Sequence, residues 1–328
     1  MFAYGPGAGY GPLREWVAAR HGVQPGRVIL TVGGLLGFVL YVQEALARRP
    51  GRVLVEAPTY DRPLKILARE EIEVVAVPMD DEGIDPDALE AELLRSSDPP
   101  SFLYTIPTFQ NPSGRTLSIE RRGRIAELAT EHQLPVLEDD PYGLVRYEGE
   151  SLPTLHELMG SALVTYTSSF SKTVAPGLRT GYFVLPSSES AAYEERVVST
   201  YISPPFLAQA TIAEFIERGR FESNLELVCA ELRARRDAML GALAGHFPEG
   251  SSWSRPEGGY FIWLDLATGQ SASELASRAD AHGVRIIPGE DFFPRGSGLG
   301  ASSARLAFSY ETPARIADGI AVLAELVR

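Results

Sequence analysis

The chain has 328 residues, enough for a large hydrophobic core, and one large domain with a smaller one is the natural expectation. Its 45% hydrophobic and 22% charged residues are ordinary for a globular protein, and its net charge of −13 argues against nucleic acid or an anionic membrane as the main partner. No run reaches the roughly 18 apolar residues of a membrane-spanning helix, and the first residues lack the pattern of a signal peptide. A single cysteine, Cys229, excludes an internal disulfide and favours the cytoplasm.

Short apolar runs alternate with amphipathic segments along the first two thirds of the chain. Residues 34–49 and 118–132 predict helices, and in the second Ser118 is a candidate N-cap while Ile125 and Leu128 share a face. The runs that predict buried strands are 52–58, 74–79, 101–107, 134–139 and 162–168. This alternation predicts an α/β fold in which a mostly parallel sheet lies between helices.

The pattern changes near residue 224. A long amphipathic helix over 224–246 leads to the strand-like "GGYFIWLDL", and a second strand-like run, "ARLAFSY", precedes a closing helix. These elements predict a smaller α+β domain at the C-terminus. We therefore expect an N-terminal arm (1–20), a large domain (21–223) and a small C-terminal domain (224–328).

Polar and aromatic side chains follow the predicted strands at the points where the strands end. Tyr60 follows the first strand, Asn111 lies in "TFQNPSG", Asp139 and Tyr142 lie in "DDPYG", and Lys172 lies in "FSK". The carboxyl ends of parallel strands form one edge of the sheet, and ligands bind beyond that edge. The sequence therefore predicts that these side chains converge on one site.

Lys172 is one of only two lysines in the chain, and all the other residues among its 30 Lys+Arg are arginine. An amine can lose its proton and attack a carbonyl to form a Schiff base, which a guanidinium cannot do. The other lysine, Lys65, lies in the helix-like "DRPLKILARE", where a solvated role is expected. Lys172 is therefore the candidate for binding an aldehyde cofactor.

The residues around Lys172 match what pyridoxal 5'-phosphate requires of a protein. Its pyridine nitrogen needs a carboxylate, supplied by Asp139, and its phenolic oxygen needs donors, supplied by Asn111 and Tyr142. Tyr60 can cover the ring face. The candidate phosphate ligands are the backbone amides of the helix-opening turn "TVGGLLG" together with hydroxyls and a guanidinium: Gly33, Gly34, Leu35, Ser169, Ser171 and Arg179. Each feature alone also fits a turn, a cap or a surface charge, but their combination predicts the cofactor site.

The motifs resemble those of the fold-type-I pyridoxal-phosphate-dependent aminotransferases of class I/II, closest to the 2-aminoadipate, kynurenine and branched-chain aminotransferase branch. The motifs that carry the resemblance are "YGPGAGYGPLREWVAARHGV", "EAPTY", "PTFQNPSG", "EDDPYG", "SSFSKTVAPGLRTGY", "PEGGYFIWLDL" and "ARLAFS". It implies a large domain with a sheet of the seven-stranded type, and amino acid and 2-oxo acid substrates. Arg305, with Asn111, would bind the substrate α-carboxylate. It also implies a homodimer with shared active sites, in which Tyr4 would reach the partner's phosphate.

Two features depart from the family pattern. The family usually has a Ser-Gln pair where this chain has Gly34 and Leu35, which removes two side-chain contacts near the phosphate and ring. Family members also carry several dozen residues before the tyrosine motif. That segment is either absent here or lies upstream of the given start.

The leading interpretation is an aminotransferase in which Lys172 moves a proton between the substrate Cα and the cofactor. One alternative keeps the cofactor but performs elimination, cyclisation or oxidative deamination. Another is a non-catalytic sensor domain of the kind fused to winged-helix regulators, against which the acidic charge and the lack of a DNA-binding segment argue.

Overall fold

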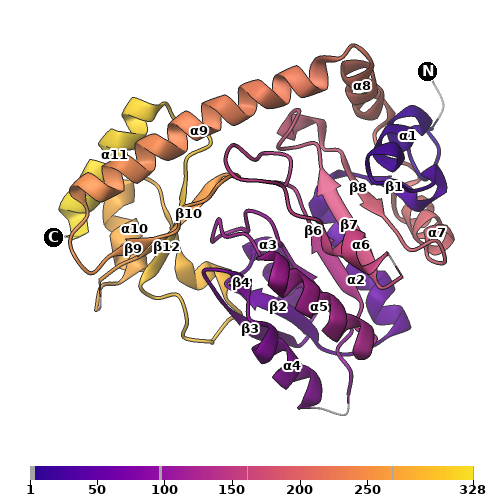
Figure 1. Ribbon diagram of the computed structural model, residues 1–328, viewed down its shortest axis with the longest axis horizontal. Coiled ribbons are helices and arrows are strands. Elements are labelled where there is room, and N and C mark those ends of the chain that lie inside the picture. The colour runs from indigo at the N-terminus through magenta and orange to yellow at the C-terminus, as the bar shows by residue number, and fades with distance from the viewer. Residues whose placement is uncertain (1–3, 96–97, 161, 268, 328) are drawn as a thin grey trace.

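The computed structural model describes residues 4–95, 98–160, 162–267 and 269–327. In this part of the chain a large sheet has eight strands in the order β1-β8-β7-β6-β5-β2-β3-β4 (Figure 1). Its strands are β1 (Val28–Thr31), β2 (Val53–Ala57), β3 (Val74–Asp80), β4 (Gly83–Ile84), β5 (Phe102–Thr105), β6 (Val136–Asp139), β7 (Val164–Ser169) and β8 (Gly181–Val184). The five strand-like runs that the sequence predicts all lie in this sheet, as β2, β3, β5, β6 and β7.

The sheet is mixed, and one strand runs against the main direction. Strands β3, β2, β5, β6 and β7 pair in parallel, whereas β8 pairs antiparallel with both β7 and β1. The mostly parallel sheet is confirmed. Because β8 is reversed, its first residue lies at the edge where its neighbours end.

Alternate residues of each strand point to opposite sides of the sheet. Apolar residues occur on both sides, and helices cover both faces. On β2, Val53 and Val55 pack with Phe38 and Leu64, whereas Leu54 packs with Ile125 on the other side. The first face is covered by α2 (Gly33–Arg48), α3 (Asp61–Arg69) and α7 (Ser190–Tyr201). The second is covered by α1 (Gly11–Arg20), α4 (Pro86–Leu94), α5 (Ile119–Glu131), α6 (Leu155–Met159) and α8 (Phe206–Glu217).

Side chains at the helix ends explain where several helices begin. Ser118 accepts a hydrogen bond from the Arg121 amide, as its predicted capping role requires, and Asp85 caps α4 in the same way. Thr154 and Glu157 form a reciprocal capping box on α6. These local signals set the helix boundaries close to the predicted ones.

The smaller sheet has four antiparallel strands in the order β11-β12-β10-β9. They are β9 (Ser252–Trp253), β10 (Phe261–Asp265), β11 (Ile287–Pro288) and β12 (Ser303–Ala307), and they pack against α9 (Arg220–His246), α10 (Ala272–Ala281) and α11 (Pro313–Val327). Three short 3-10 turns lie elsewhere, at Pro25–Arg27, Pro176–Leu178 and Gly289–Phe292. Helix α9 runs along the molecule from α8 to α11 (Figure 1).

Within the described ranges, no helix is both long enough and apolar enough to cross a membrane.

A fully buried arginine, Arg122, ties both ends of the β5–α5 connection to the β6–α6 connection beside the large sheet. The Arg122 guanidinium donates to the carbonyls of Leu117 (3.0 Å), Pro153 (2.9 Å) and Pro107 (3.0 Å), and to Thr108 Oγ1 (2.9 Å). Since a buried acceptor without a donor costs free energy, this guanidinium fixes the two connections relative to each other.

We predict that Arg122→Met lowers the free energy of unfolding by about 3 kcal/mol, because it leaves these buried acceptors unsatisfied. The matched control is Arg124→Met on the same helix, where the guanidinium pairs with Glu90 and Glu127 at the surface. Urea unfolding measures both variants. An Arg122→Met protein as stable as the control would contradict this account.

Candidate active site

A cavity of about 180 Å³ lies at the carboxyl edge of the large sheet. It brings together ten of the residues that the sequence singles out: Gly34, Leu35, Tyr60, Asn111, Asp139, Tyr142, Ser169, Ser171, Lys172 and Arg179. Phe38, Pro63, Ile106, Pro141 and Pro176 complete its wall. Motifs between Gly34 and Arg179, far apart in the sequence, therefore meet in one place.

The strand directions explain this convergence. Strands β2, β5, β6 and β7 end at this edge. Asp139 is the last residue of β6, and the segments that follow β2, β5 and β7 deliver Tyr60, Asn111 and Lys172. The reversed strand β8 begins here, so Arg179, which precedes it, arrives at the same edge.

Lys172 is half-buried between two tyrosine rings. Its Nζ lies 4.9 Å from the centre of the Tyr260 ring and 5.8 Å from that of Tyr142. Burial lowers the pKa of Lys172, and the charges of Arg305 and Arg179 act in the same direction. A lowered pKa increases the fraction of neutral amine, which is the form that attacks a carbonyl or accepts a proton.

Three consecutive acidic residues end β6, and each has a different environment. Glu138 accepts from the amides of Leu155 (2.9 Å) and His156 (2.8 Å), so it fixes the start of α6. Asp140 accepts from Tyr166 Oη (3.0 Å) and from the Gly143 amide (2.7 Å). Of the three, only Asp139 lines the cavity.

Asp139 is a carboxylate in surroundings that disfavour its charge. Burial raises the pKa of Asp139 to about 7, and the hydrogen bond from Tyr104 acts against this rise. The charges of Asp140 and Glu56 add to the rise. A cation placed in the cavity against Asp139 would relieve the penalty, and a protonated pyridine ring is such a cation.

Hydrogen bonds to the buried carboxylate of Glu56 hold the loop that carries Asn111. Glu56 accepts from Thr105 Oγ1 (2.6 Å), the Ile106 amide (3.1 Å) and Gln110 Nε2 (3.1 Å). Gln110 also donates to the Pro58 carbonyl (2.7 Å), so it joins this loop to the segment before Tyr60. Sequence reasoning missed both Glu56 and Gln110, although a glutamate inside the apolar run "VLVEAP" was an available signal.

Arg305 lies on the central strand β12 of the smaller sheet and reaches the same region. Its Nη1 donates to Asn111 Oδ1 (2.9 Å), and its guanidinium carbon lies 4.3 Å and 4.9 Å from the ring centres of Phe261 and Phe292. Its Nε is buried and has no hydrogen-bond partner among the described residues. A guanidinium with a donor to spare, between two aromatic rings, is suited to a carboxylate ligand.

Near the start of α2 the cavity has hydrogen-bond donors that suit a phosphate. The N-terminus of α2 has no side-chain cap, so its first amides remain available for an anion. Gly33 has φ +75° and packs against the Arg179 guanidinium so closely that a Cβ there would collide with it. At Gly34 an added Cβ would meet no atom within 4 Å.

These features fit pyridoxal phosphate. The uncapped amides, Arg179 and the hydroxyls of Ser169 and Ser171 suit its phosphate, and Asp139 suits its ring nitrogen. Lys172 lies in the same cavity with a lowered pKa, as covalent binding of an aldehyde requires.

Four residues that the sequence singles out do not line this cavity. Gly33 and Arg305 contact residues that do, whereas Tyr4 and Lys65 lie on the surface. Tyr4 is 78% exposed on the N-terminal arm. Lys65 is exposed on α3, where its amine donates to Asp61 at 2.7 Å. The solvated environment expected for Lys65 is thus the observed one.

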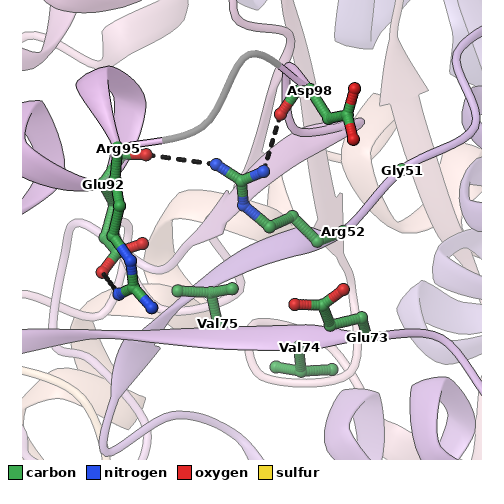
Figure 2. A pocket seen from close by; sticks show the side chains of 8 residues that line it. All are labelled: Gly51, Arg52, Glu73, Val74, Val75, Glu92, Arg95 and Asp98. Atoms are coloured by element: carbon green, nitrogen blue, oxygen red, sulfur yellow. Dashed lines mark hydrogen bonds and ion pairs between the residues drawn. The ribbon is translucent and has the colours of Figure 1, made fainter.

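A larger cavity, of about 610 Å³, lies at the amino ends of β2 and β3, away from these residues (Figure 2). Its two arginines already have hydrogen-bond partners. Arg52 donates to the carbonyls of Asp98 (2.6 Å) and Glu92 (3.1 Å), and Arg95 pairs with the Glu92 carboxylate at 2.7 Å. The cationic groups that line it are therefore already engaged, and the chemistry points to the smaller cavity.

Known proteins are similar to this chain in sequence and in fold. The family model for aminotransferases of class I and II matches residues 1–317. The chain is 34% identical to aromatic-amino-acid aminotransferase 1 of Thermococcus litoralis, over 99% of this chain and 79% of that protein. It is 35% identical to the 2-aminoadipate transaminase of Thermus thermophilus, over 97% of this chain and 79% of that protein.

A solved structure agrees closely as well. The α-aminoadipate aminotransferase of Thermus thermophilus, complexed with N-(5'-phosphopyridoxyl)-L-leucine, superposes with a TM-score of 0.92. The sequences are 34% identical, and the match covers 99% of this chain and 83% of that chain.

The fold and the comparisons define an aminotransferase of fold type I, and the chain belongs to the aminotransferase class I and II family. It transfers an amino group from an amino acid to a 2-oxo acid, and its cofactor is pyridoxal 5'-phosphate. The comparisons give no support to elimination, cyclisation or oxidative deamination. An HTH-type transcriptional regulator of Bacillus subtilis is also similar, at 30% identity, but this chain covers only 61% of it, whereas the relatives at 34% and 35% identity are aminotransferases.

Proposed function

We propose that Lys172 is the catalytic residue of this aminotransferase: it binds the cofactor aldehyde covalently and, once released by the incoming amino acid, moves a proton from the substrate Cα. Pyridoxal phosphate supplies the electron sink that stabilises the negative charge left on Cα. The lowered pKa of Lys172 supports this role, because a neutral amine is needed to accept the proton. The tyrosine rings of Tyr142 and Tyr260 limit the directions in which the amine can move.

The groups around the lysine would hold the cofactor in place. Asp139 would pair with the ring nitrogen, while Asn111 and Tyr142 would bind the phenolic oxygen and Tyr60 would cover the ring. The first amides of α2 would bind the phosphate together with three side chains at the end of β7 and in the segment after it: Ser169, Ser171 and Arg179. This assignment is supported by their convergence on one cavity.

Arg305 would bind the α-carboxylate of the substrate, next to Asn111. The observation that supports this is its buried Nε without a partner, on a guanidinium fixed between Phe261 and Phe292. Two parallel hydrogen bonds from a planar guanidinium would orient the substrate so that its Cα faces Lys172. Aromatic amino acids and 2-aminoadipate, which appear in the relatives' names, are the first donors to test.

We also propose that the active unit is a homodimer in which Tyr4 reaches the partner's phosphate. Tyr4 is exposed in the single chain, and the arm that carries it lies on an apolar patch, with the ring of Tyr10 5.1 Å from that of Phe206. Exposed apolar side chains gather on α7, on α8 and between them: Val198, Ile202, Phe206 and Leu207. Such a patch is typical of a surface that binds a partner.

The cytoplasmic location remains a prediction from composition. It is supported by the single cysteine, Cys229, which can form no internal disulfide.

Lys172→Ala should abolish the covalent link and nearly all turnover, because no other amine lines the described cavity. Borohydride reduction of the wild-type protein followed by peptide mapping locates the pyridoxyl group. Lys65→Ala is the matched control and should keep both the link and the activity. A pyridoxyl group on Lys65 would refute the assignment.

Arg305→Lys should raise KM for amino acids and lower kcat/KM by the equivalent of roughly 2–4 kcal/mol, because an ammonium group cannot make the paired hydrogen bonds. Affinity for pyridoxal phosphate should stay close to that of the wild type. Arg62→Lys, an arginine near the cavity that is exposed to solvent, serves as the control. If Arg305→Lys loses the cofactor while KM is unchanged, the roles are reversed: Arg305 would bind the phosphate and Arg179 the substrate carboxylate.

A heterodimer of one Lys172→Ala subunit and one Tyr4→Ala subunit tests the shared site. If Tyr4 acts in the partner, one of its two sites has both residues intact, and activity should return to about half that of the wild-type dimer. Differently tagged subunits allow the heterodimer to be isolated. An inactive heterodimer of confirmed composition would show that Tyr4 acts within its own subunit or has no role.

A further inference from the structure

Two consecutive aspartates at the end of β6 each receive a hydrogen bond from a tyrosine hydroxyl. Tyr104 Oη donates to Asp139 Oδ2 at 2.7 Å, and Tyr166 Oη donates to Asp140 Oδ2 at 3.0 Å. Consecutive strand residues point to opposite faces of a sheet, so the two pairs lie on opposite sides. The pair with Asp139 borders the cavity that holds Lys172, and the pair with Asp140 does not.

The hydroxyl of Tyr104 is held in a fixed position. Tyr104 is fully buried on β5, and its neighbour across the sheet is Leu137 of β6. Its ring packs edge-on against Phe38 of α2, with centroids 5.2 Å apart. Because both strands and the helix restrain this ring, Oδ2 of Asp139 is restrained as well.

The electrostatic surroundings make this hydrogen bond important. Burial and the charges of Asp140 and Glu56 raise the pKa of Asp139, and the Tyr104 hydroxyl is the group that opposes them. Tyr60 and Tyr142 also face the carboxylate, both as neutral hydroxyls whose pKa is raised by burial. Burial raises the pKa of Tyr104 well above its usual value too, so it remains a hydrogen-bond donor over the whole working pH range.

We propose that Tyr104 is a positioning residue for the cofactor: its hydroxyl fixes one carboxylate oxygen of Asp139, keeps the group ionised, and leaves the other oxygen to the pyridine nitrogen. This rests on the role proposed above for Asp139. Tyr104 itself touches neither substrate nor cofactor and acts through that carboxylate.

The test measures the dissociation constant of pyridoxal phosphate from the apoprotein between pH 5.5 and pH 8.5, in the wild type and in Tyr104→Phe. Removing the hydroxyl takes a donor from the ionised carboxylate, so the Asp139 proton is released at higher pH. The midpoint below which affinity falls should rise by about one pH unit. At pH 6 the variant should bind about tenfold more weakly than the wild type, and at pH 8.5 the two should differ little.

Tyr166→Phe is the matched control, since it removes the same hydroxyl from the pair on the other face. It should leave the pH midpoint unchanged. Equal midpoints in the wild type, Tyr104→Phe and Tyr166→Phe would overturn the proposal, and so would equal shifts in both variants. Circular dichroism and melting temperatures check that both proteins fold.

Asp139→Asn separates failure of this proposal from failure of the proposed function. It should weaken binding at every pH, and adding Tyr104→Phe to it should have no further effect. If Asp139→Asn weakens binding but Tyr104→Phe leaves the pH midpoint unchanged, Asp139 keeps its role and the positioning role of Tyr104 is wrong. If Asp139→Asn binds as the wild type does, the role of Asp139 is wrong, and that of Tyr104 falls with it.

Discussion

The structure depends on the requirement that a charge taken out of water must be hydrogen-bonded. Several loops near the cavity are each tied to a buried ionisable group whose hydrogen-bond partners lie in that loop. Glu56 holds the segment leading to Asn111, and Arg122 anchors the same segment from the other side. Glu138 holds the start of α6, and Asp140 holds the turn around Tyr142. Moving any of these loops would leave a buried charge without its partners, so the site is rigid before a ligand arrives.

Burial in this rigid site also explains why a lysine and an aspartate have shifted pKa values. Lys172 and Asp139 are both displaced from their usual pKa by the same burial that excludes water, in opposite directions for an amine and a carboxylate. Each is thus destabilised in its charged form until a cofactor completes the site. The cavity favours a ligand that brings an aldehyde to one group and a cation to the other.

Much of this could be predicted from the sequence because the signals are local. Strand ends, the Ser118 cap and the scarcity of lysine each depend on a few neighbouring residues, and they locate the edge, a helix and Lys172. The hydrogen bonds that hold the site residues in place depend instead on how the strands pair across the sheet. Tyr104 meets Asp139 only because β5 and β6 pair in one particular register, and a shift of one residue would point Tyr104 to the other face. Likewise, nothing in the β8 sequence "GYFV" indicates that this strand runs antiparallel to β7.

Helix α9 has a mechanical consequence for the whole molecule. It is one unbroken helix of 27 residues, about 40 Å long, with Phe221 in the core beside α1 and Leu243 in the core of the smaller sheet. Near its start, Phe221 contacts the Trp16 ring at 5.0 Å and Glu222 pairs with Arg20. Because this helix is continuous, it links the core of the smaller sheet to the core beside α1 through one stiff element. The arm with Tyr4 leads directly into α1, so a force applied near Arg305 in the smaller domain has a stiff route to the surface proposed to meet the partner subunit.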